Sequence, residues 1–322
     1  MTTLGICIPT YRRPDFLRRC ILSALQSARD DAVRIFVADD AVDGTNDALL
    51  RELCAAHPSI RVQRNAVNLG IDDNIQSAVD LCDCDYAWLV GEDDTFLPGA
   101  VDAVLETLQD MSWPFVLANY AYVGEDPAQR IGTALPETMD GTLQAEPFLS
   151  AHLWAAGFIG ACVVRKAEWS RTQASPYKGT YFTHVGRIAE IVSDAGGAAV
   201  VGRPCVANRV EGTDTFTWKR DTYGVFFGFL AMCQAVALRR PARRDAMAAA
   251  AGTMERRYRW LSLRLAMRLR SERGYDHAQY SRYLRHGPVG TLKRLAFLAI
   301  SVAPPALFRP LVIAYRMLRT RS

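Results

Sequence analysis

The chain of 322 residues lacks the segments that would mark export or membrane insertion. No signal peptide precedes the first apolar segment, because a strand-like stretch already begins at Leu4. No apolar run reaches the roughly 18 residues that a membrane span requires. The longest, residues 295–307, is interrupted by Pro304 and Pro305. We therefore expect a cytoplasmic protein.

Two phosphate-binding signatures and a zinc signature are also missing. No Gly-x-Gly-x-x-Gly follows the first strand-like segment and no Gly-Lys-Ser/Thr occurs, which argues against a dinucleotide dehydrogenase and a P-loop enzyme. The eight cysteines are scattered among apolar residues. Cys82 and Cys84 lie too close together for a zinc knuckle and have no partner pair. We expect reduced core cysteines.

The charge distribution is uneven along the chain. Half of the residues are hydrophobic and 22% are charged, which is typical of a globular protein with one large or two modest domains. The formal net charge is only +4, but residues 239–322 hold 19 Lys and Arg against 4 acids. This excess of positive charge indicates a polyanionic partner, either nucleic acid or an anionic membrane surface.

Residues 1–220 alternate strand-like and helix-like segments. The pattern predicts strands at 4–8, 34–38, 60–64, 86–90, 115–122, 158–164 and 198–206. Helices are expected at 15–27, 45–56, 72–81, 98–111 and 181–194. Such alternation predicts an α/β fold with a mostly parallel central sheet in three layers, and residues 125–146 as a surface excursion. From 221 to 322 the pattern is helical and Arg-rich, with helices at 223–237 and 244–269, so we place a domain boundary near 220.

Polar clusters follow the predicted strands and should line one rim of the sheet. The strand at 86–90 runs directly into Glu92, Asp93 and Asp94. Three adjacent carboxylates repel one another unless a cation lies between them, and Mg²⁺ or Mn²⁺ commonly arrives with phosphates. The acids therefore predict a metal–diphosphate site at a strand end. The alternative is a solvated acidic turn before the helix that starts at Pro98.

Four blocks in order resemble family 2 glycosyltransferases of the GT-A fold. They are the Pro-Thr-Tyr-Arg-Arg loop in 6–13, the Asp-Asp and Asp-Gly-Thr pair in 37–45, the Asn-Leu-Gly loop in 68–74 and the acids in 88–94. Residues 160–165, with Trp169, are similar to the abequosyltransferase-like branch that transfers deoxyhexoses in bacterial surface polysaccharides. The resemblance covers about residues 4–210. Glu92 replaces the usual first Asp of the metal motif, and Arg12 stands where Asn is common.

The resemblance implies an inverting transfer from a UDP- or dTDP-sugar to a hydroxyl of a glycan or lipid-linked acceptor, with Mg²⁺ or Mn²⁺. Asp94 would be a catalytic metal ligand, and Glu92 and Asp93 would share metal and ribose contacts. Asp39 would accept from the imide N–H of the base, although Asp40 is an alternative. The other implied donor-binding residues are Pro9, Thr10, Tyr11, Arg13, Asn68 and Asn74, of which Asn74 could instead cap a helix.

The catalytic base is expected about a hundred residues past the acids. His184, near a predicted helix start, titrates in the right range. It could equally be a third metal ligand or a core histidine. Glu190 and Asp194 lie further along the same helix, and Arg187 would contact acceptor or phosphate, or lie on the surface.

Two other functions are alternatives to sugar transfer. A sugar-phosphate nucleotidyltransferase would require a Gly-rich phosphate loop after the first strand, which is absent. A non-catalytic sugar-nucleotide-binding protein would have no need of all three acids.

The basic C-terminal segments 258–269 and 292–319 combine Arg with Leu, Ala, Tyr and Trp. This blend is typical of helices that lie on a membrane surface, which would suit a lipid-linked acceptor. The alternative is a helical cap with solvated Arg faces. No stacking motif supports nucleic-acid binding.

Overall fold

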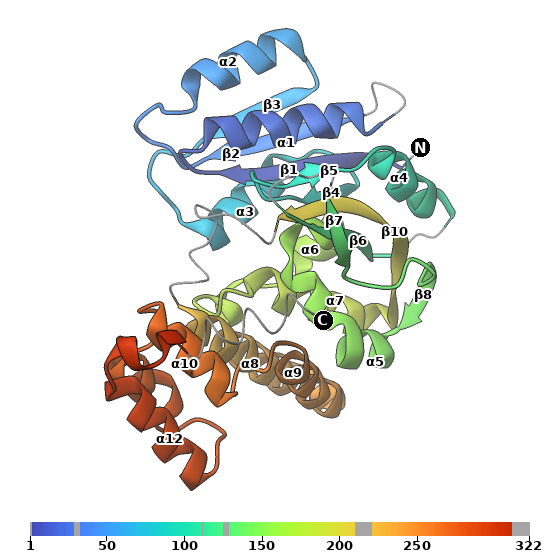
Figure 1. Ribbon diagram of the computed structural model, residues 1–322. Coiled ribbons are helices and arrows are strands. Elements are labelled where there is room, and N and C mark those ends of the chain that lie inside the picture. The colour runs from blue at the N-terminus through green and yellow to red at the C-terminus, as the bar shows by residue number, and fades with distance from the viewer. Residues whose placement is uncertain (1, 29–32, 111–112, 125–128, 210–220, 311–322) are drawn as a thin grey trace.

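A computed structural model describes residues 2–28, 33–110, 113–124, 129–209 and 221–310 (Figure 1). These residues build a central sheet with helices on its faces, followed by a helical C-terminal region. Along the sheet the strand order is β3-β2-β1-β4-β9-β6-β10-β5, with β7 beside β6 and β8 beside β10. The α/β fold expected from the sequence is confirmed.

The N-terminal part of the sheet is parallel. Its strands are β1 (Leu4–Thr10), β2 (Arg34–Asp39), β3 (Ile60–Arg64) and β4 (Tyr86–Leu89). The connecting helices are α1 (Pro14–Gln26), α2 (Asp47–Ala56) and α3 (Ile71–Leu81). In α1, Leu17, Cys20, Ile21 and Ala24 recur at helical spacing and are all buried against the sheet.

The middle of the sheet departs from the expected parallel order. The predicted strand at 158–164 is shorter, because residues 159–161 form a 3₁₀ turn and β9 spans only Cys162–Arg165. β9 runs antiparallel to both β4 and β6 (Phe115–Val123). Two antiparallel steps restore the direction, so β6 and β10 (Gly197–Arg209) are parallel to β4. The carboxyl ends of β1, β2, β4, β6 and β10 therefore share one rim.

The remaining strands and α-helices complete the sheet region. They are β5 (Thr95–Phe96), α4 (Ala100–Asp110), β7 (Arg130–Thr133), β8 (Gly141–Gln144), α5 (Ala145–Pro147), α6 (Lys166–Arg171) and α7 (Thr183–Ala195). The expected surface excursion thus contributes two strands to the sheet, while residues 125–128 lie outside the described part of the chain. All eight cysteines are free and seven are buried, as expected for core residues.

The C-terminal region consists of α8 (Thr222–Arg239), α9 (Arg244–Tyr258), α10 (Leu263–Ser271), α11 (His277–Gln279) and α12 (Thr291–Val302). These helices lie together on one side of the sheet region in Figure 1. The predicted helix at 244–269 is broken, because Arg259 adopts a left-handed φ of 51° that ends α9. The Ser262 side chain then caps α10.

The two regions are packed together. Phe182 beside α7 meets Phe229 of α8 edge to face, with ring centroids 5.1 Å apart. The carboxylate of Asp221 accepts hydrogen bonds from Tyr181 and Tyr283, both at 3.1 Å, and caps α8 through Gly224 N. The predicted boundary near residue 220 adjoins residues 210–220, which lie outside the described part.

Helix α8 has the length and apolar composition of a membrane span, with a mean hydropathy of 1.3. The sequence-based search for long apolar runs did not single it out. Buried helices of globular proteins have the same composition, and eight of its residues are buried in this structure. Composition alone is therefore weak evidence for a span.

Candidate functional site

The loop after β1 is fastened to Glu92. One carboxylate oxygen of Glu92 accepts from the Thr10 hydroxyl and, at 2.9 Å, from the Tyr11 backbone N–H. Its other oxygen lies 3.6 Å from Arg13, which also pairs with Asp93 at 3.2 Å. Burial raises the pKa of Glu92 to about 7, although these hydrogen bonds and Arg13 oppose the shift. Glu92 therefore holds the 10–13 loop in place.

Asp94 is buried at the same strand end. Its Oδ2 accepts from the Gly91 backbone N–H at 2.9 Å, within a tight turn. A Cβ added to Gly160 would come within 3.0 Å of that oxygen, so the carboxylate lies against the backbone of residue 160. Burial and the neighbouring Asp93 raise the pKa of Asp94 well above its ordinary value. A buried carboxylate with so little compensation is suited to receiving a cation.

The three acids do not form a metal site made of protein ligands alone. Within the described ranges, no group of three or more His, Cys, Asp or Glu side chains is placed to hold a metal ion. Mg²⁺ is commonly bound by one or two carboxylates together with substrate phosphates and water. Asp94 fits such a shared site, and the metal roles of Asp94 and Glu92 remain predictions.

The two consecutive acids that end β2 differ in what they contact. Asp40 uses both oxygens: Oδ1 accepts from Asn65 at 2.7 Å and Oδ2 from Gly70 N at 3.1 Å. Asp39 uses Oδ1, which accepts from Asn46 at 2.8 Å and from Ala41 N at 3.0 Å. Its Oδ2 is buried and has no hydrogen-bond partner in the described part of the chain. Such an acceptor fits an imide or amine N–H of a base, which favours Asp39 over Asp40.

Asparagine side chains fix the loops around this acid pair. Asn65 donates to Asn74 Oδ1 at 2.9 Å, and Asn74 donates to the Thr10 carbonyl at 3.2 Å. Asn68 accepts from Gly70 N at 2.9 Å and is exposed. Gly70 has a φ of 77°, which a side chain would strain. In this structure Asn68 and Asn74 therefore shape the loops, and their contacts with a donor remain predictions.

The remaining predicted residues of the first loop lie at the same rim. Pro9 is buried within β1, and Tyr11 is 39% exposed. Arg12 has a φ of 57°, a conformation that Asn adopts more readily, and pairs with Asp43 at 2.9 Å. The exposed Tyr11 ring is available for stacking, with the Arg12 guanidinium 5.0 Å from its centre.

His184 lies in the first turn of α7 and is only 6% exposed. Its Nε2 lies 3.1 Å from the Ala156 carbonyl oxygen, and burial lowers the pKa of the ring to about 4. These contacts match the core histidine that the sequence left open as an alternative. The assignment of His184 as base remains a prediction.

The other charged residues of α7 hold helices together. Glu190 is buried and accepts from Tyr177 and from Arg239 of α8. Asp194 pairs with Arg240 at 2.8 Å. Arg187 lies 3.5 Å from the centre of the Trp169 ring and donates to the Trp169 carbonyl at 2.7 Å. These contacts give Arg187 a structural position away from the surface.

One cation at the rim was missed by the sequence analysis. Arg209 ends β10, and its positive charge lowers the pKa of Asp94 against the effect of burial. Its guanidinium lies 4.7 Å from the centre of the Phe16 ring. One buried Nη atom has no hydrogen-bond partner in the described ranges. The available signal was its place just after an apolar strand, where the other polar clusters also fall.

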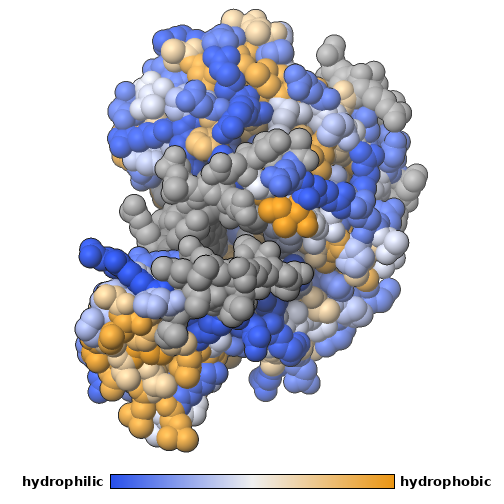
Figure 2. All heavy atoms as spheres, viewed as in Figure 1, coloured by the Kyte–Doolittle hydropathy of each residue, from blue (hydrophilic) through white to orange (hydrophobic). Residues whose placement is uncertain are grey.

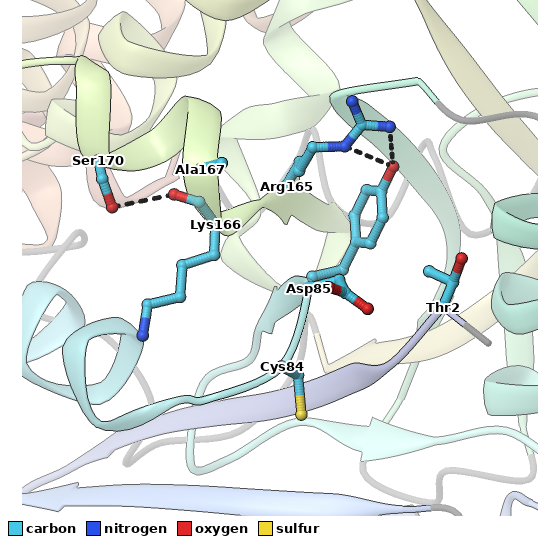
Figure 3. A pocket seen from close by; sticks show the side chains of 8 residues that line it. Thr2, Cys84, Asp85, Arg165, Lys166, Ala167 and Ser170 are labelled. Atoms are coloured by element: carbon cyan, nitrogen blue, oxygen red, sulfur yellow. Dashed lines mark hydrogen bonds between the residues drawn. The ribbon is translucent and has the colours of Figure 1, made fainter.

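A cavity of about 680 Å³ lies at the other end of the strands, beside the amino end of β4 (Figure 3). Asp85, Tyr86, Arg165 and Lys166 line it, and Arg165 donates to the Tyr86 hydroxyl at 2.7 and 3.0 Å. Since the acids follow the carboxyl ends of the strands, this cavity is not the predicted donor site.

Comparison with known proteins agrees with this fold. The model of the family described as "Glycosyl transferase family 2" matches residues 5–170. The chain is 26% identical to abequosyltransferase RfbV of Salmonella typhimurium over 244 residues, which cover 71% of this chain and 72% of the relative. Solved structures of S. aureus TarS 1–349 share the fold. The structure reported without a ligand has a TM-score of 0.60, and the complex with UDP-GlcNAc has 0.59. Each is 11% identical and covers 98% of this chain and 92% of TarS 1–349. Because the family model spans more than half of the chain and includes all four sequence blocks, the protein belongs to glycosyl transferase family 2 and is a glycosyltransferase.

Proposed function

We propose that the protein transfers a sugar, with inversion, from a nucleoside diphosphate sugar to a hydroxyl of a glycan or lipid-linked acceptor. One observation carries this proposal. Three groups belong to strand ends of one rim: the buried Asp94 carboxylate, and the buried Asp39 Oδ2 and Arg209 Nη, which have no hydrogen-bond partner among the residues that the structure describes. They offer an acceptor for a base, a carboxylate for a cation and a cation for a phosphate, in one row.

The donor would lie along this rim. Asp39 accepts an N–H of the base, and the exposed Tyr11 ring stacks near it. Arg209 and Arg13 approach the diphosphate and stabilise the negative charge that develops as the C1–oxygen bond breaks. UDP and dTDP both present an imide N–H to such an acceptor.

Asp94 is the residue that would hold Mg²⁺ or Mn²⁺, with the remaining ligands from phosphate and water. Such an ion supplies charge neutralisation of the leaving diphosphate. Glu92 fixes Thr10 and Tyr11 through one carboxylate oxygen, and its other oxygen is the atom that would contribute to the cation.

Inversion requires a group that removes the proton of the acceptor hydroxyl as the new oxygen–C1 bond forms. His184 is neutral at physiological pH because its pKa is near 4, so it has the proton-free form that a base requires. Because the Ala156 carbonyl accepts from Nε2–H, the lone pair of the neutral ring lies on Nδ1, and this nitrogen would have to reach the acceptor hydroxyl.

The proposal is tested by donor hydrolysis with purified protein, a panel of UDP- and dTDP-sugars, and Mn²⁺ or EDTA. We expect one donor to be hydrolysed only with the metal, and Asp94→Asn to abolish that turnover while the melting temperature is maintained. Glu106→Gln, on the exposed face of α4, is the control and should retain activity. Metal-independent turnover, or full activity of Asp94→Asn, would remove the cation from the proposal.

We further propose that the protein binds an anionic membrane surface through α12. Leu292, Leu295, Val302 and Leu307 are between 57% and 85% exposed, and Lys293 and Arg309 lie among them. Figure 2 shows this apolar patch over the C-terminal helices. Apolar side chains with basic neighbours are typical of helices at a lipid interface. Residues 311–319 of the predicted membrane segment lie outside the described part.

A further inference from the structure

An aromatic cluster joins the Asp94 end of the site to the C-terminal helices. A Cβ added to Gly160 would lie 3.0 Å from Asp94 Oδ2 and 2.8 Å from the Phe158 ring, so the ring and the carboxylate are neighbours. The Phe158 ring packs on Tyr120, with centroids 4.4 Å apart. Tyr120 meets Tyr122 edge to face at 5.5 Å.

Helix α9 adds a cation to this cluster. Arg257 donates to the Tyr122 hydroxyl at 3.2 Å. Its guanidinium lies 3.6 Å from the centre of the Trp154 ring and 5.9 Å from that of Tyr258. Figure 1 shows α9 below the strands that carry the tyrosines. The cluster thus consists of Tyr120, Tyr122, Trp154, Phe158, Arg257 and Tyr258.

The cluster has the composition of a carbohydrate-binding surface. Tyr258 is 42% exposed and Arg257 is exposed, while Tyr122 and Phe158 are partly accessible. Aromatic faces pack against the apolar C–H faces of sugar rings, and phenols and guanidinium groups hydrogen-bond to sugar hydroxyls.

The position of the cluster distinguishes it from the donor contacts. Asp39 and Tyr11 lie at the ends of β2 and β1, whereas Tyr122 lies at the end of β6, on the other side of β4. Asp94, after β4, stands between the two groups. A sugar held by the cluster would approach the acid from the side opposite to the base-binding residues.

We propose that Tyr122, Phe158, Arg257 and Tyr258 bind the acceptor glycan and place its hydroxyl near Asp94. This inference rests on the proposed function. It specifies the acceptor as a neutral or weakly anionic sugar ring. It also gives α9 a role in the reaction, because Arg257 belongs to this helix and contacts Tyr122 at the end of β6.

The test separates acceptor binding from donor chemistry. With the donor found by the hydrolysis panel, labelled sugar is transferred to the membrane glycan fraction of the source organism. Arg257→Gln and Tyr258→Ala should raise the KM for this fraction about tenfold or more. Donor hydrolysis and donor KM should stay within about twofold of the wild type.

Arg256→Gln is the matched control, because Arg256 is exposed on the same helix and donates to Thr253 at 2.9 Å instead of contacting the cluster. It should leave both reactions unchanged. An unchanged acceptor KM in Arg257→Gln and Tyr258→Ala would overturn the inference, as would a parallel loss of donor hydrolysis, which would indicate a folding defect. If the wild type hydrolyses no donor, the proposed function itself fails.

Discussion

Asp39 and Asp40 are adjacent, buried acids that make different hydrogen bonds. Both carboxylate oxygens of Asp40 accept hydrogen bonds, from Asn65 and Gly70, whereas one oxygen of Asp39 has no partner in the described residues. A buried acceptor that lacks a donor costs free energy in the absence of ligand, and a ligand that supplies the donor recovers it. The same substitution at the two positions should therefore have different effects.

Asp39→Asn is expected to weaken UDP binding by about tenfold or more, because an amide N–H would face the base N–H. Asp40→Asn should instead lower the free energy of unfolding by about 1–2 kcal/mol, since it weakens one buried and one partly buried hydrogen bond that hold the loop. Calorimetric titration with UDP and urea unfolding of both variants provide the measurements. Equal loss of UDP affinity in both variants would contradict the division of roles.

His184 makes stability depend on pH. Its pKa is about 4 in the folded chain and near 6.5 when unfolded, so the unfolded state binds more protons between these values. Stability is therefore present above pH 6.5 and is lost as pH falls towards 4, by up to about 3 kcal/mol. Urea unfolding at pH 4.5 and 7 should show a smaller pH dependence for His184→Gln than for the wild type.

The same histidine can be tested as the base. His184→Ala should lower the transfer rate about 100-fold or more if the ring removes the acceptor proton. If the stability of His184→Gln depends on pH as strongly as that of the wild type, the pKa of the ring does not differ between the folded and unfolded chain. If His184→Ala transfers at the normal rate, the base lies elsewhere.

At the scale of the element, α7 depends on a glycine in its first turn. A Cβ added to Gly186 would lie 2.5 Å from the Tyr177 ring, which is fully buried. Gly186→Ala should therefore destabilise the protein by about 1–3 kcal/mol, although alanine is favoured over glycine in helices. In α9, a Cβ on Gly252 would meet only the flexible end of Arg256, at 3.2 Å. Gly252→Ala should be neutral or stabilise by up to about 1 kcal/mol, and thermal unfolding distinguishes the pair.

The sequence predicted the parallel half of the sheet because its strands and helices alternate at regular spacing. It also indicated the rim, since the residues after β1, β2 and β4 are polar. The antiparallel β9 was not predictable from local pattern, because strand direction depends on long-range pairing. The 3₁₀ turn at Ile159–Ala161 shortens the predicted strand. Arg209 and Arg257 were missed because their neighbours come from distant parts of the chain.

At the scale of the whole molecule, the C-terminal region carries both the basic charge and the exposed apolar patch. We expect full-length protein to bind phosphatidylglycerol vesicles more tightly than phosphatidylcholine vesicles, with affinity falling as salt rises. Leu292→Glu combined with Leu295→Glu should reduce binding about tenfold or more, because each leucine contributes about 1.5–3 kcal/mol when buried in lipid. Sedimentation with vesicles provides the measurement.

Leu238→Glu is the control for this surface, since Leu238 is 78% exposed but lies on α8. It should leave vesicle binding unchanged. No sedimentation of the wild type with either lipid, at low or high salt, would show that α12 does not contact membranes.

The Arg257 guanidinium enters the cluster from α9, while the acids that we propose to contact the donor all belong to the first hundred residues. Selection for a new acceptor can therefore alter one late helix without disturbing how the activated sugar is recognised. A hybrid enzyme that exchanges α9 with that of a family member should inherit its donor from one parent and part of its acceptor preference from the other.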